Sequence, residues 1–304
     1  MRREDSVESR KDVAIIIVGL NACKYVRECL HSLKVAEWKQ YSHEVIYVDN
    51  GSIDDTLVAV PADFPEVRVI SNPSNLGFCK AANQGARIAT SRYYFFLNDD
   101  TTVLEDAVPL LIGFMERHSQ VAVIGSRLLN PDFTDQWSGR KFPSPWNAIL
   151  GRRSLLSRWI PKAKLLADYL CREQILRGEP FAVDWVSAAA LLAEQASFWS
   201  VGGFAEDYYY WHEAVFCDRI RGISKEIYLH PQSRVVHHEG KGSGKRPYHI
   251  RKRLIVDFHW GAYRCYCEHY RLTRFHPIRA LVGAGLLARA AVLLAFHRIA
   301  GFQR

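Results

Sequence analysis

The sequence lacks the cysteine spacing of disulfide-rich and zinc-binding proteins. Its seven cysteines are an odd number in a chain of 304 residues, and no two of them form a C-x-x-C pair. Cys265 and Cys267 lie close together, but a zinc site of this type needs a second pair of ligands. We therefore interpret the cysteines as mostly buried, reduced thiols of a cytosolic protein.

Acidic residues are scarce in the last quarter of the chain. Residues 241–304 contain 13 Lys and Arg against two acids, a net charge of +11, whereas the whole chain carries +8. The first 240 residues therefore carry a net charge of −3. This asymmetry indicates an anionic surface as the partner of the C-terminal segment, either a membrane or a nucleic acid.

The apolar stretch 277–296 is interrupted only by Arg279 and Arg289. A membrane-spanning helix would have to carry Arg289 near its centre, which is costly. We expect instead an amphipathic helix that lies on an anionic membrane surface with its arginines toward the headgroups. Packing within the protein, contact between copies, and a true span are the alternatives. So much Leu and Ala argues against nucleic acid as a partner.

What the sequence does contain is an alternation of apolar strands with helices. Strands are predicted at 13–20 (VAIIIVGL), 43–52 (HEVIYVDNGS), 68–72 (RVISN), 92–100 (RYYFFLNDD), 121–129 (VAVIGSRLL) and 183–194, two short ones within 226–240, and helices at 78–90, 104–118 and the end of 201–222. This alternation predicts parallel βαβ units, in which ligands bind at the carboxyl ends of the strands. No internal repeat interrupts it.

Polar side chains collect at those predicted strand ends. Asn21 follows the first strand, Asp49 ends the second, and Asp99 and Asp100 end the fourth. A pair of carboxylates at this edge suits Mg²⁺ or Mn²⁺, which bind oxygen ligands and bridge to phosphates. The alternative is that Asp100 or Thr101 caps the next helix.

Several blocks of the sequence together resemble a known family. They are VDNGSIDDT (48–56), NPSNLGFCKAANQGARIATSRYYFFLNDDTTV (72–103), VDWVSAAALL (183–192), VGGFAEDYYYWHE (201–213) and RVVHHEGKGSG (234–244). In this order, over about residues 13–245, they resemble the family 2 glycosyltransferases with the GT-A fold, particularly the bacterial rhamnosyltransferase-like branch. The resemblance implies an α/β fold with a mostly parallel, Rossmann-like central sheet flanked by helices and a C-terminal helical extension.

The resemblance, together with the charge and apolar pattern of the flanking segments, predicts a domain plan. Residues 1–12 would be a flexible N-terminus that carries no apolar signal segment. Residues 13–245 would be the GT-A domain, with a nucleotide-sugar-binding half at 13–130 and an acceptor-binding half at 131–245. Residues 246–304 would be the basic amphipathic helical extension.

The resemblance also implies a site for a nucleotide diphosphate sugar and for Mg²⁺ or Mn²⁺. Asp49 would bind the nucleotide base. Asp100 and His237 would hold the metal, with His238 as the neighbouring possibility. The other donor-binding residues would be Val18, Asn21, Asn50, Asn75, Gly77, Lys80, Asn83, Asn98 and Asp99. In the loop that follows, Lys241, Lys245 and Arg246 could contact the diphosphate or simply form a solvated basic loop.

The catalytic base is where the sequence departs from the family pattern. Members usually read GGFDExFFxYFEDVDxCxR, with the Asp after Glu as the base, and this chain reads GGFAEDYYYWHEAVFCDR. Without a gap, Ala214 replaces that Asp. With one residue deleted in the Tyr run, Phe216, Cys217 and Arg219 return to register, and Glu213 becomes the base. We prefer the second alignment, the alternative being a solvated charge at a helix start.

The activity implied is inverting transfer of the sugar to a hydroxyl of a glycan or lipid-linked glycan in cell-surface polysaccharide synthesis, by a cytoplasmic protein peripheral to the inner face of the membrane. The acceptor would contact Trp185, Tyr210, Trp211 and His212, although core packing explains each ring equally well. Ala214, together with Ala188 where the family often has Gly, leaves an inactive glycan-binding or scaffolding protein as the alternative. A sugar nucleotidyltransferase is disfavoured, because GLNACKYV (19–26) is not a Gly-rich basic phosphate loop.

Overall fold

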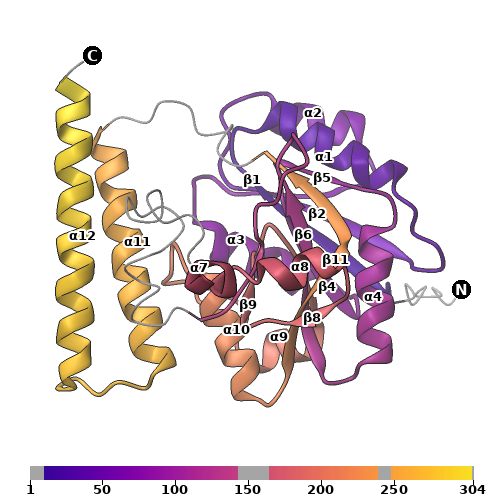
Figure 1. Cartoon of the computed structure of the whole chain (residues 1–304). Coiled ribbons are helices and arrows are strands. Elements are labelled where there is room, and N and C mark those ends of the chain that lie inside the picture. The colour runs from indigo at the N-terminus through magenta and orange to yellow at the C-terminus, as the bar shows by residue number, and fades with distance from the viewer. Residues whose placement is uncertain (1–9, 143–163, 239–247, 303–304) are drawn as a thin grey trace, which may run out of the picture.

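The protein is described by a computed structural model that covers residues 10–142, 164–238 and 248–302. A central nine-stranded sheet is flanked by helices, and a pair of long helices stands at one side (Figure 1). The sheet contains β1 (Val13–Gly19), β2 (His43–Asp49), β3 (Arg68–Ser71), β4 (Tyr93–Asn98), β5 (Thr101–Val103), β6 (Val121–Leu129), β8 (Phe181–Ala182), β10 (Ala190–Glu194) and β11 (Glu226–His237). A separate two-stranded sheet contains β7 (Gly139–Arg140) and β9 (Trp185–Val186).

The strand order is β3-β2-β1-β4-β10-β6-β11-β5, and β8 pairs with β11. Strands β3, β2, β1 and β4 are parallel to one another, as the alternating pattern predicts. Strand β10 is antiparallel to both β4 and β6. The sheet is therefore mostly parallel with an antiparallel insertion in its middle, which confirms the predicted fold class.

Successive side chains of β1 point to opposite faces of the sheet and enter two separate hydrophobic clusters. Ile15 and Ile17 pack on one face, and Ala14 and Ile16 pack on the other. Because both faces are covered by helices, the strand reads as one continuous apolar run. Gly85 lets a helix lie directly on the sheet, since a Cβ there would come within 2.7 Å of Ile16 Cγ2.

The helices that surround the sheet are α1 (Cys23–Val35), α2 (Thr56–Asp63), α3 (Phe78–Ile88), α4 (Ala107–Arg117), α7 (Lys164–Tyr169), α8 (Arg172–Arg177), α9 (Gln195–Ser200) and α10 (His212–Gly222). Helices α3, α4 and α10 lie close to the ranges predicted from the sequence. Helices α2 and α9 and strand β5 are not in the sequence-based prediction. The seven cysteines are free, and all but Cys23 are buried, as expected.

Three predictions of local structure are wrong. The single strand expected at 183–194 is divided into β9 and β10, which belong to different sheets. The two short strands expected at 226–240 are one strand, β11, whose register against β6 shifts between His230 and Arg234. Residues 10–12 of the expected flexible N-terminus are held, because Arg10 bonds to Gln195 and Asp12 bonds to Ser42; residues 1–9 lie outside the described ranges.

The C-terminal extension is a pair of antiparallel helices, α11 (Tyr248–His269) and α12 (Pro277–Phe302), with α12 outermost (Figure 1). Arg279 and Arg289 of α12 lie on the side toward α11, contrary to the expectation that they face headgroups. Arg279 donates hydrogen bonds from Nε to Tyr263 Oη at 2.8 Å and from Nη1 to the Leu272 carbonyl oxygen at 3.3 Å. Arg289 is partly buried near His259 of α11. The side turned outward is therefore the apolar one.

Candidate active site

The carboxyl ends of β1, β2 and β4 place three predicted residues at one edge of the sheet. Gly19 is paired with Asp49, and Val18 is paired with both Val48 and Asn98. The Asp49 side chain is fully buried, and its Oδ2 accepts hydrogen bonds from the backbone N–H groups of Gly51 and Ser52. Among the described residues none donates to Asp49 Oδ1. A buried carboxylate oxygen without a donor is costly, so this atom is suited to accept a hydrogen bond from a ligand.

The loops beside Asp49 are ordered by their own asparagines. Asn50 Nδ2 donates to Asn75 Oδ1, and Asn50 Oδ1 accepts from the Leu76 N–H. Asn75 Oδ1 also accepts from the N–H of Gly77. Gly77 has a φ of +85° and immediately precedes α3. Asn21 Oδ1 accepts from the Ile53 N–H in the same way. Four of the predicted donor-binding residues thus shape this edge of the sheet, and the side chains of the three asparagines are engaged with the protein.

Two predicted donor-binding residues lie on α3. Lys80 is exposed. Asn83 is buried, and its amide bonds to the segment before α10: Nδ2 donates to the Phe204 carbonyl oxygen and to Glu206 Oε1, and Oδ1 accepts from the Phe204 N–H. The prediction that Asn83 contacts the donor is therefore corrected, because its amide groups are used to hold this turn.

Asp99 and Asp100 point in different directions. The Asp99 carboxylate accepts a hydrogen bond from the Leu20 N–H and lies against Gly19, where a Cβ would be 2.9 Å from its Oδ2. Burial, and then the adjacent Asp100 carboxylate, raise the pKa of Asp99 to about 7. Neither aspartate caps a helix, because Thr101–Val103 forms β5 and α4 begins only at Ala107. The helix-cap alternative is therefore wrong.

Asp100 and His237 are brought together by strand pairing. Strand β5 runs antiparallel to β11, with Thr101 opposite His237. This register places His237 Nε2 at 3.2 Å from Asp100 Oδ1 and 3.2 Å from Asn98 Nδ2. The neighbouring His238 donates its backbone N–H to the Asp100 carbonyl oxygen. The two residues predicted to hold the metal are thus adjacent, although they are 137 positions apart in the sequence.

This pair fits a divalent cation. A carboxylate oxygen and an imidazole nitrogen are both ligands that Mn²⁺ accepts, and they face each other across 3.2 Å. No group of three or more His, Cys, Asp or Glu is gathered anywhere in the described part of the chain. Two protein ligands are nevertheless what a Mg²⁺ or Mn²⁺ site needs when substrate phosphates supply others.

His212 and Glu213 begin α10 on the other side of the site. Glu213 Oε2 lies 3.4 Å from His212 Nε2, and neither this oxygen nor His212 Nδ1 has a hydrogen-bond partner among the described residues. The His212 ring packs against Phe78, the first residue of α3, at 4.9 Å between ring centroids. The pair therefore borders the turn at Gly77 that the family resemblance places next to the donor.

Neighbouring positions at the start of α10 differ in burial. Ala214 is fully buried in the core, together with Phe216 and Cys217, whereas Glu213 is partly exposed. A carboxylate at position 214 would enter the core without a partner. Of the two positions, 213 is therefore the one at which this helix carries an acid.

The four predicted acceptor-binding residues divide into one buried ring and three consecutive residues at the start of α10. Trp185 is 3% exposed, its Nε1 donates to the Lys141 carbonyl oxygen, and the guanidinium of Arg140 lies 4.6 Å from its ring centroid. Its predicted contact with acceptor is therefore corrected to core packing. Tyr210, Trp211 and His212 are partly exposed and consecutive, and they retain an accessible edge.

The turn that carries these residues is strained and is held by α11. Trp211 has a φ of +70°, which is rare for a bulky residue, and its Nε1 donates to the Phe258 carbonyl oxygen. Gly261 of α11 allows close approach, since a Cβ there would lie 3.0 Å from the Tyr210 carbonyl oxygen. The sequence gives no signal for this contact, because α11 is separated from the turn by more than 30 residues.

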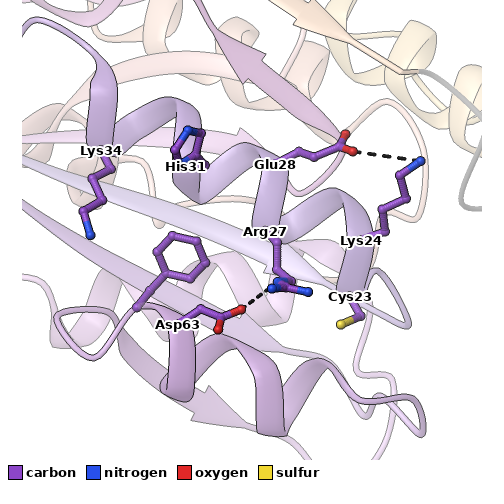
Figure 2. Close-up of a pocket in the computed structure, with 8 residues that line it drawn as sticks. Cys23, Lys24, Arg27, Glu28, His31, Lys34 and Asp63 are labelled. Atoms are coloured by element: carbon purple, nitrogen blue, oxygen red, sulfur yellow. Dashed lines mark ion pairs between the residues drawn. The ribbon is translucent and has the colours of Figure 1, made fainter.

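A surface hollow elsewhere is not the predicted site. It has a volume of about 710 Å³ and lies between α1 and α2 (Figure 2). Its lining residues are Cys23, Lys24, Arg27, Glu28, His31, Lys34, Asp63 and Phe64. Two of its cations are paired, Lys24 with Glu28 and Arg27 with Asp63. The predicted donor, metal and acceptor residues are all outside it.

Comparison with known proteins agrees with this arrangement. The profile of Glycosyl transferase family 2 matches residues 14–170, which is more than half of the chain. The chain belongs to glycosyl transferase family 2. A curated relative is the N-acetylglucosaminyl-diphospho-decaprenol L-rhamnosyltransferase of Mycobacterium tuberculosis, which is 26% identical over 245 residues, 77% of this chain and 78% of the relative.

Solved structures of glycosyltransferases share the GT-A fold of this family 2 chain. The mannosyltransferase PcManGT from Pyrobaculum calidifontis, in complex with GDP-Man and Mn²⁺, superimposes with a TM-score of 0.60 at 17% identity, covering 97% of this chain and 81% of that one. GalNAc-T7 with UDP, GalNAc and Mn²⁺ gives a TM-score of 0.59 at 17% identity, covering 76% of this chain and 44% of that one. This chain thus spans less than half the length of GalNAc-T7.

Proposed function

We propose that this protein is an inverting, metal-dependent glycosyltransferase that moves a sugar from a nucleotide diphosphate sugar to a hydroxyl of a lipid-linked glycan. The observation that carries the proposal is the meeting of Asp100 and His237 at the strand edge that also holds Asp49. A base-binding carboxylate and a cation-binding pair on one edge suit a ligand with a nucleoside at one end and a diphosphate at the other.

The donor would lie along this edge of the sheet. The unpartnered Oδ1 of Asp49 would accept a hydrogen bond from the nucleotide base, since it is the buried acceptor there that lacks a donor. Asp100 and His237 would hold Mg²⁺ or Mn²⁺, and a divalent cation at this place would stabilise the negative charge on the leaving diphosphate. Asp99 lies behind this pair and orders the Leu20 backbone.

Glu213 would act as the general base. Inverting transfer needs a carboxylate that removes the proton of the acceptor hydroxyl as it attacks the sugar carbon from the face opposite the diphosphate. Glu213 Oε2 has no hydrogen-bond donor among the described residues, so it is free to accept that proton. The partly exposed edge formed by Tyr210, Trp211 and His212 would receive the acceptor sugar.

The rhamnosyltransferase relative supports the choice of substrates. As its name states, that relative is an L-rhamnosyltransferase of N-acetylglucosaminyl-diphospho-decaprenol, and the alignment covers 77% of this chain. We extend this class to the present protein: a deoxyhexose donor and a polyprenyl diphosphate-linked sugar acceptor in the synthesis of cell-surface polysaccharide.

A transfer assay tests the proposal. A panel of nucleotide diphosphate sugars, with L-rhamnose and mannose donors among them, would be incubated with Mn²⁺ and a lipid-diphosphate-linked N-acetylglucosamine, and the product anomer determined by NMR. We expect metal-dependent transfer with inverted configuration. No transfer and no hydrolysis with any donor, despite measurable binding of the nucleotide, would instead support the inactive glycan-binding alternative.

The outward face of α12 fits a membrane surface. Pro277–Phe296 is long and apolar enough to cross a bilayer by length and composition. However, both of its arginines face α11, and Leu281 and Leu287 on its outward face are each 73% exposed. Lys252, near the start of α11, and Arg298, near the end of α12, are both exposed. The start of α11 and the end of α12 lie at the same end of the antiparallel pair (Figure 1). An apolar face with cations at one end is typical of a helix that lies in a membrane interface.

We therefore place the protein peripherally on the cytoplasmic face of an anionic membrane, where a lipid-linked acceptor is within reach. Flotation with anionic liposomes tests this placement, using the double variant Leu281→Glu/Leu287→Glu. We expect the variant to lose most of its partitioning. Val58→Glu is the matched control, because Val58 on α2 is 74% exposed but lies far from the helix pair. Equal partitioning of all three proteins would contradict the proposal.

A further inference from the structure

Gln136 lies directly behind His237, outside the residues that the family resemblance singles out. His237 Nδ1 is 2.8 Å from Gln136 Oε1, and Gln136 Nε2 donates to the His237 carbonyl oxygen at 2.7 Å. The glutamine therefore contacts both the ring and the backbone of the same histidine. It is 6% exposed and comes from the segment just before β7, which the sequence analysis does not place in the site.

The orientation of the Gln136 amide is fixed by its neighbours. A backbone carbonyl oxygen can only accept, so the atom that faces the His237 carbonyl must be the amide nitrogen. That nitrogen also donates to Asn130 Oδ1 at 2.9 Å. Asn130 is oriented in turn, because its Nδ2 donates to Thr134 Oγ1. The Thr134 hydroxyl itself donates to Asp132 Oδ1, so its oxygen is the acceptor for Asn130. Reversing the Gln136 amide would bring its oxygen against two other oxygens.

A fixed amide determines which ring nitrogen of His237 carries the proton. Gln136 Oε1 can only accept, so His237 Nδ1 must be the donor. In a neutral imidazole the other nitrogen, Nε2, then has a lone pair. This lone pair faces Asp100 Oδ1 at 3.2 Å, and the Asn98 amide can donate to it from 3.2 Å.

We propose that Gln136 is a positioning residue that holds His237 in the Nδ1-protonated tautomer and so presents the Nε2 lone pair toward Asp100. The proposal rests on the proposed function in taking this pair as the cation site. Outer partners of this kind fix the ring orientation of a ligating histidine and typically change metal affinity 10- to 100-fold. Gln136 itself touches no substrate in this scheme.

The tautomer can be measured without metal or activity. Long-range ¹⁵N–¹H NMR of the histidine rings distinguishes the two neutral tautomers, at a pH above the measured midpoint of His237. The His237 signals are assigned by their loss in a His237→Gln variant, which separates them from the other eleven histidines. We expect the wild-type protein to carry the proton on Nδ1. A proton on Nε2 in the folded wild-type protein would overturn the proposal, whatever the enzyme does.

Two variants test the role of the Gln136 oxygen. Gln136→Met keeps the side-chain length but removes the acceptor, and we expect a shift toward the Nε2-protonated tautomer and about 10- to 100-fold weaker Mn²⁺ binding by EPR titration. Gln136→Glu keeps an acceptor at Nδ1 and should retain the Nδ1-protonated tautomer. Its second oxygen cannot donate to the His237 carbonyl oxygen or to Asn130 Oδ1, so its Mn²⁺ affinity should lie between those of Gln136→Met and the wild-type protein. Circular dichroism confirms that each variant is folded. Unchanged tautomer and Mn²⁺ affinity in a folded Gln136→Met protein would refute the inference. If the tautomer shifts as expected but the wild-type protein transfers no sugar, the proposed function fails and this inference stands.

Discussion

The cation side and the base side of the candidate site differ in what holds them in place. Asp100 and His237 are adjacent because β5 pairs with β11, so backbone hydrogen bonds within the sheet set their distance. Glu213 stands on the first turn of α10, after Trp211 with its φ of +70°. Phe258 of α11 accepts the hydrogen bond that secures this turn.

This difference indicates that the two C-terminal helices would affect function in separate ways. The outward face of α12 would contact a membrane. Helix α11 contacts the segment before α10 at several points. Tyr208 Oη donates to Glu268 Oε1 at 2.7 Å, and Arg264 forms an ion pair with Asp207. Displacement of α11 should therefore move the base and leave the cation pair in place. Three predictions test this separation, and a fourth probes the strand that carries His237.

The largest effect is expected on the cation side. Asp100→Ala removes a proposed metal ligand and leaves His237 alone. Mn²⁺ binding should therefore be lost, and transfer should fall by about 10³-fold or more, as for other losses of transition-state charge stabilisation. Steady-state kinetics across a Mn²⁺ titration would measure it. Asp106→Asn is the control, because Asp106 pairs only with Lys39 at the surface among the described residues and should change neither quantity. Transfer by Asp100→Ala at the wild-type rate would disprove the metal assignment.

The next effect belongs to the base. Glu213→Gln keeps the shape of the side chain but cannot take a proton, and kcat should fall by roughly 10²- to 10⁴-fold. Mn²⁺ and nucleotide affinity, measured by calorimetry, should stay near the wild-type values. A comparable loss of Mn²⁺ affinity would mean that the two sides are not separate.

A smaller effect should follow from loosening α11 against the base turn. In Gly261→Leu the new side chain would press on the Tyr210 carbonyl oxygen, 3.0 Å from the Cβ position, and push the turn outward. We expect kcat to fall by about 10- to 100-fold, since small displacements of catalytic groups are costly, with Mn²⁺ affinity retained. Gly285→Leu on α12, where a Cβ meets no atom within 4 Å, should have no such effect. Equal kcat values for the two variants would show that α11 does not position the base.

The smallest effect concerns the pH dependence of the strand that carries His237. Burial, and then the charge of Arg117, lower the pKa of His230 in β11 to about 4. The unfolded chain binds this proton near pH 6.5 and the folded chain does not, so the free energy of unfolding should fall as pH falls from about 6.5 to about 4. Urea unfolding at pH 7 and pH 5 would measure it, and His230→Leu should reduce the difference. An unchanged difference would assign the pH dependence to other groups.

The sheet and the donor edge could be predicted from the sequence because they depend on local patterns. Continuous apolar runs identify strands that are buried on both faces, and parallel strands end at one edge, so Asp49 and Asn98 could be placed together from chain order alone. The position of β10 between β4 and β6 could not be predicted, since the pairing partners of a strand depend on which strands the fold brings together. For the same reason β5 was not predicted: it has three residues and is paired with β11.

Individual site residues show where local patterns stop being informative. Asn83 and Trp185 have the residue types of ligand-binding groups, but their side chains are used by Phe204 and Lys141. Gln136 has no motif around it, and only the fold brings it to His237. A side chain's role depends on what its polar atoms contact, and for these residues the contacts come from segments distant in the chain.

The sequence by itself determined the family, the order of strands and helices, and the residue types available at the strand ends, because these follow from local periodicity and from blocks in a fixed order. Only the tertiary structure decided which of those residues meet: Asp100 with His237, Gln136 behind the ring, and α11 against the base turn. It also decided which side of α12 faces outward, since Arg279 bonds to Tyr263 of α11 and Arg289 is partly buried on the same side. The physical reason is that polar groups are satisfied, and apolar faces covered, by whatever the fold brings within contact distance, and linear sequence does not encode that distance directly.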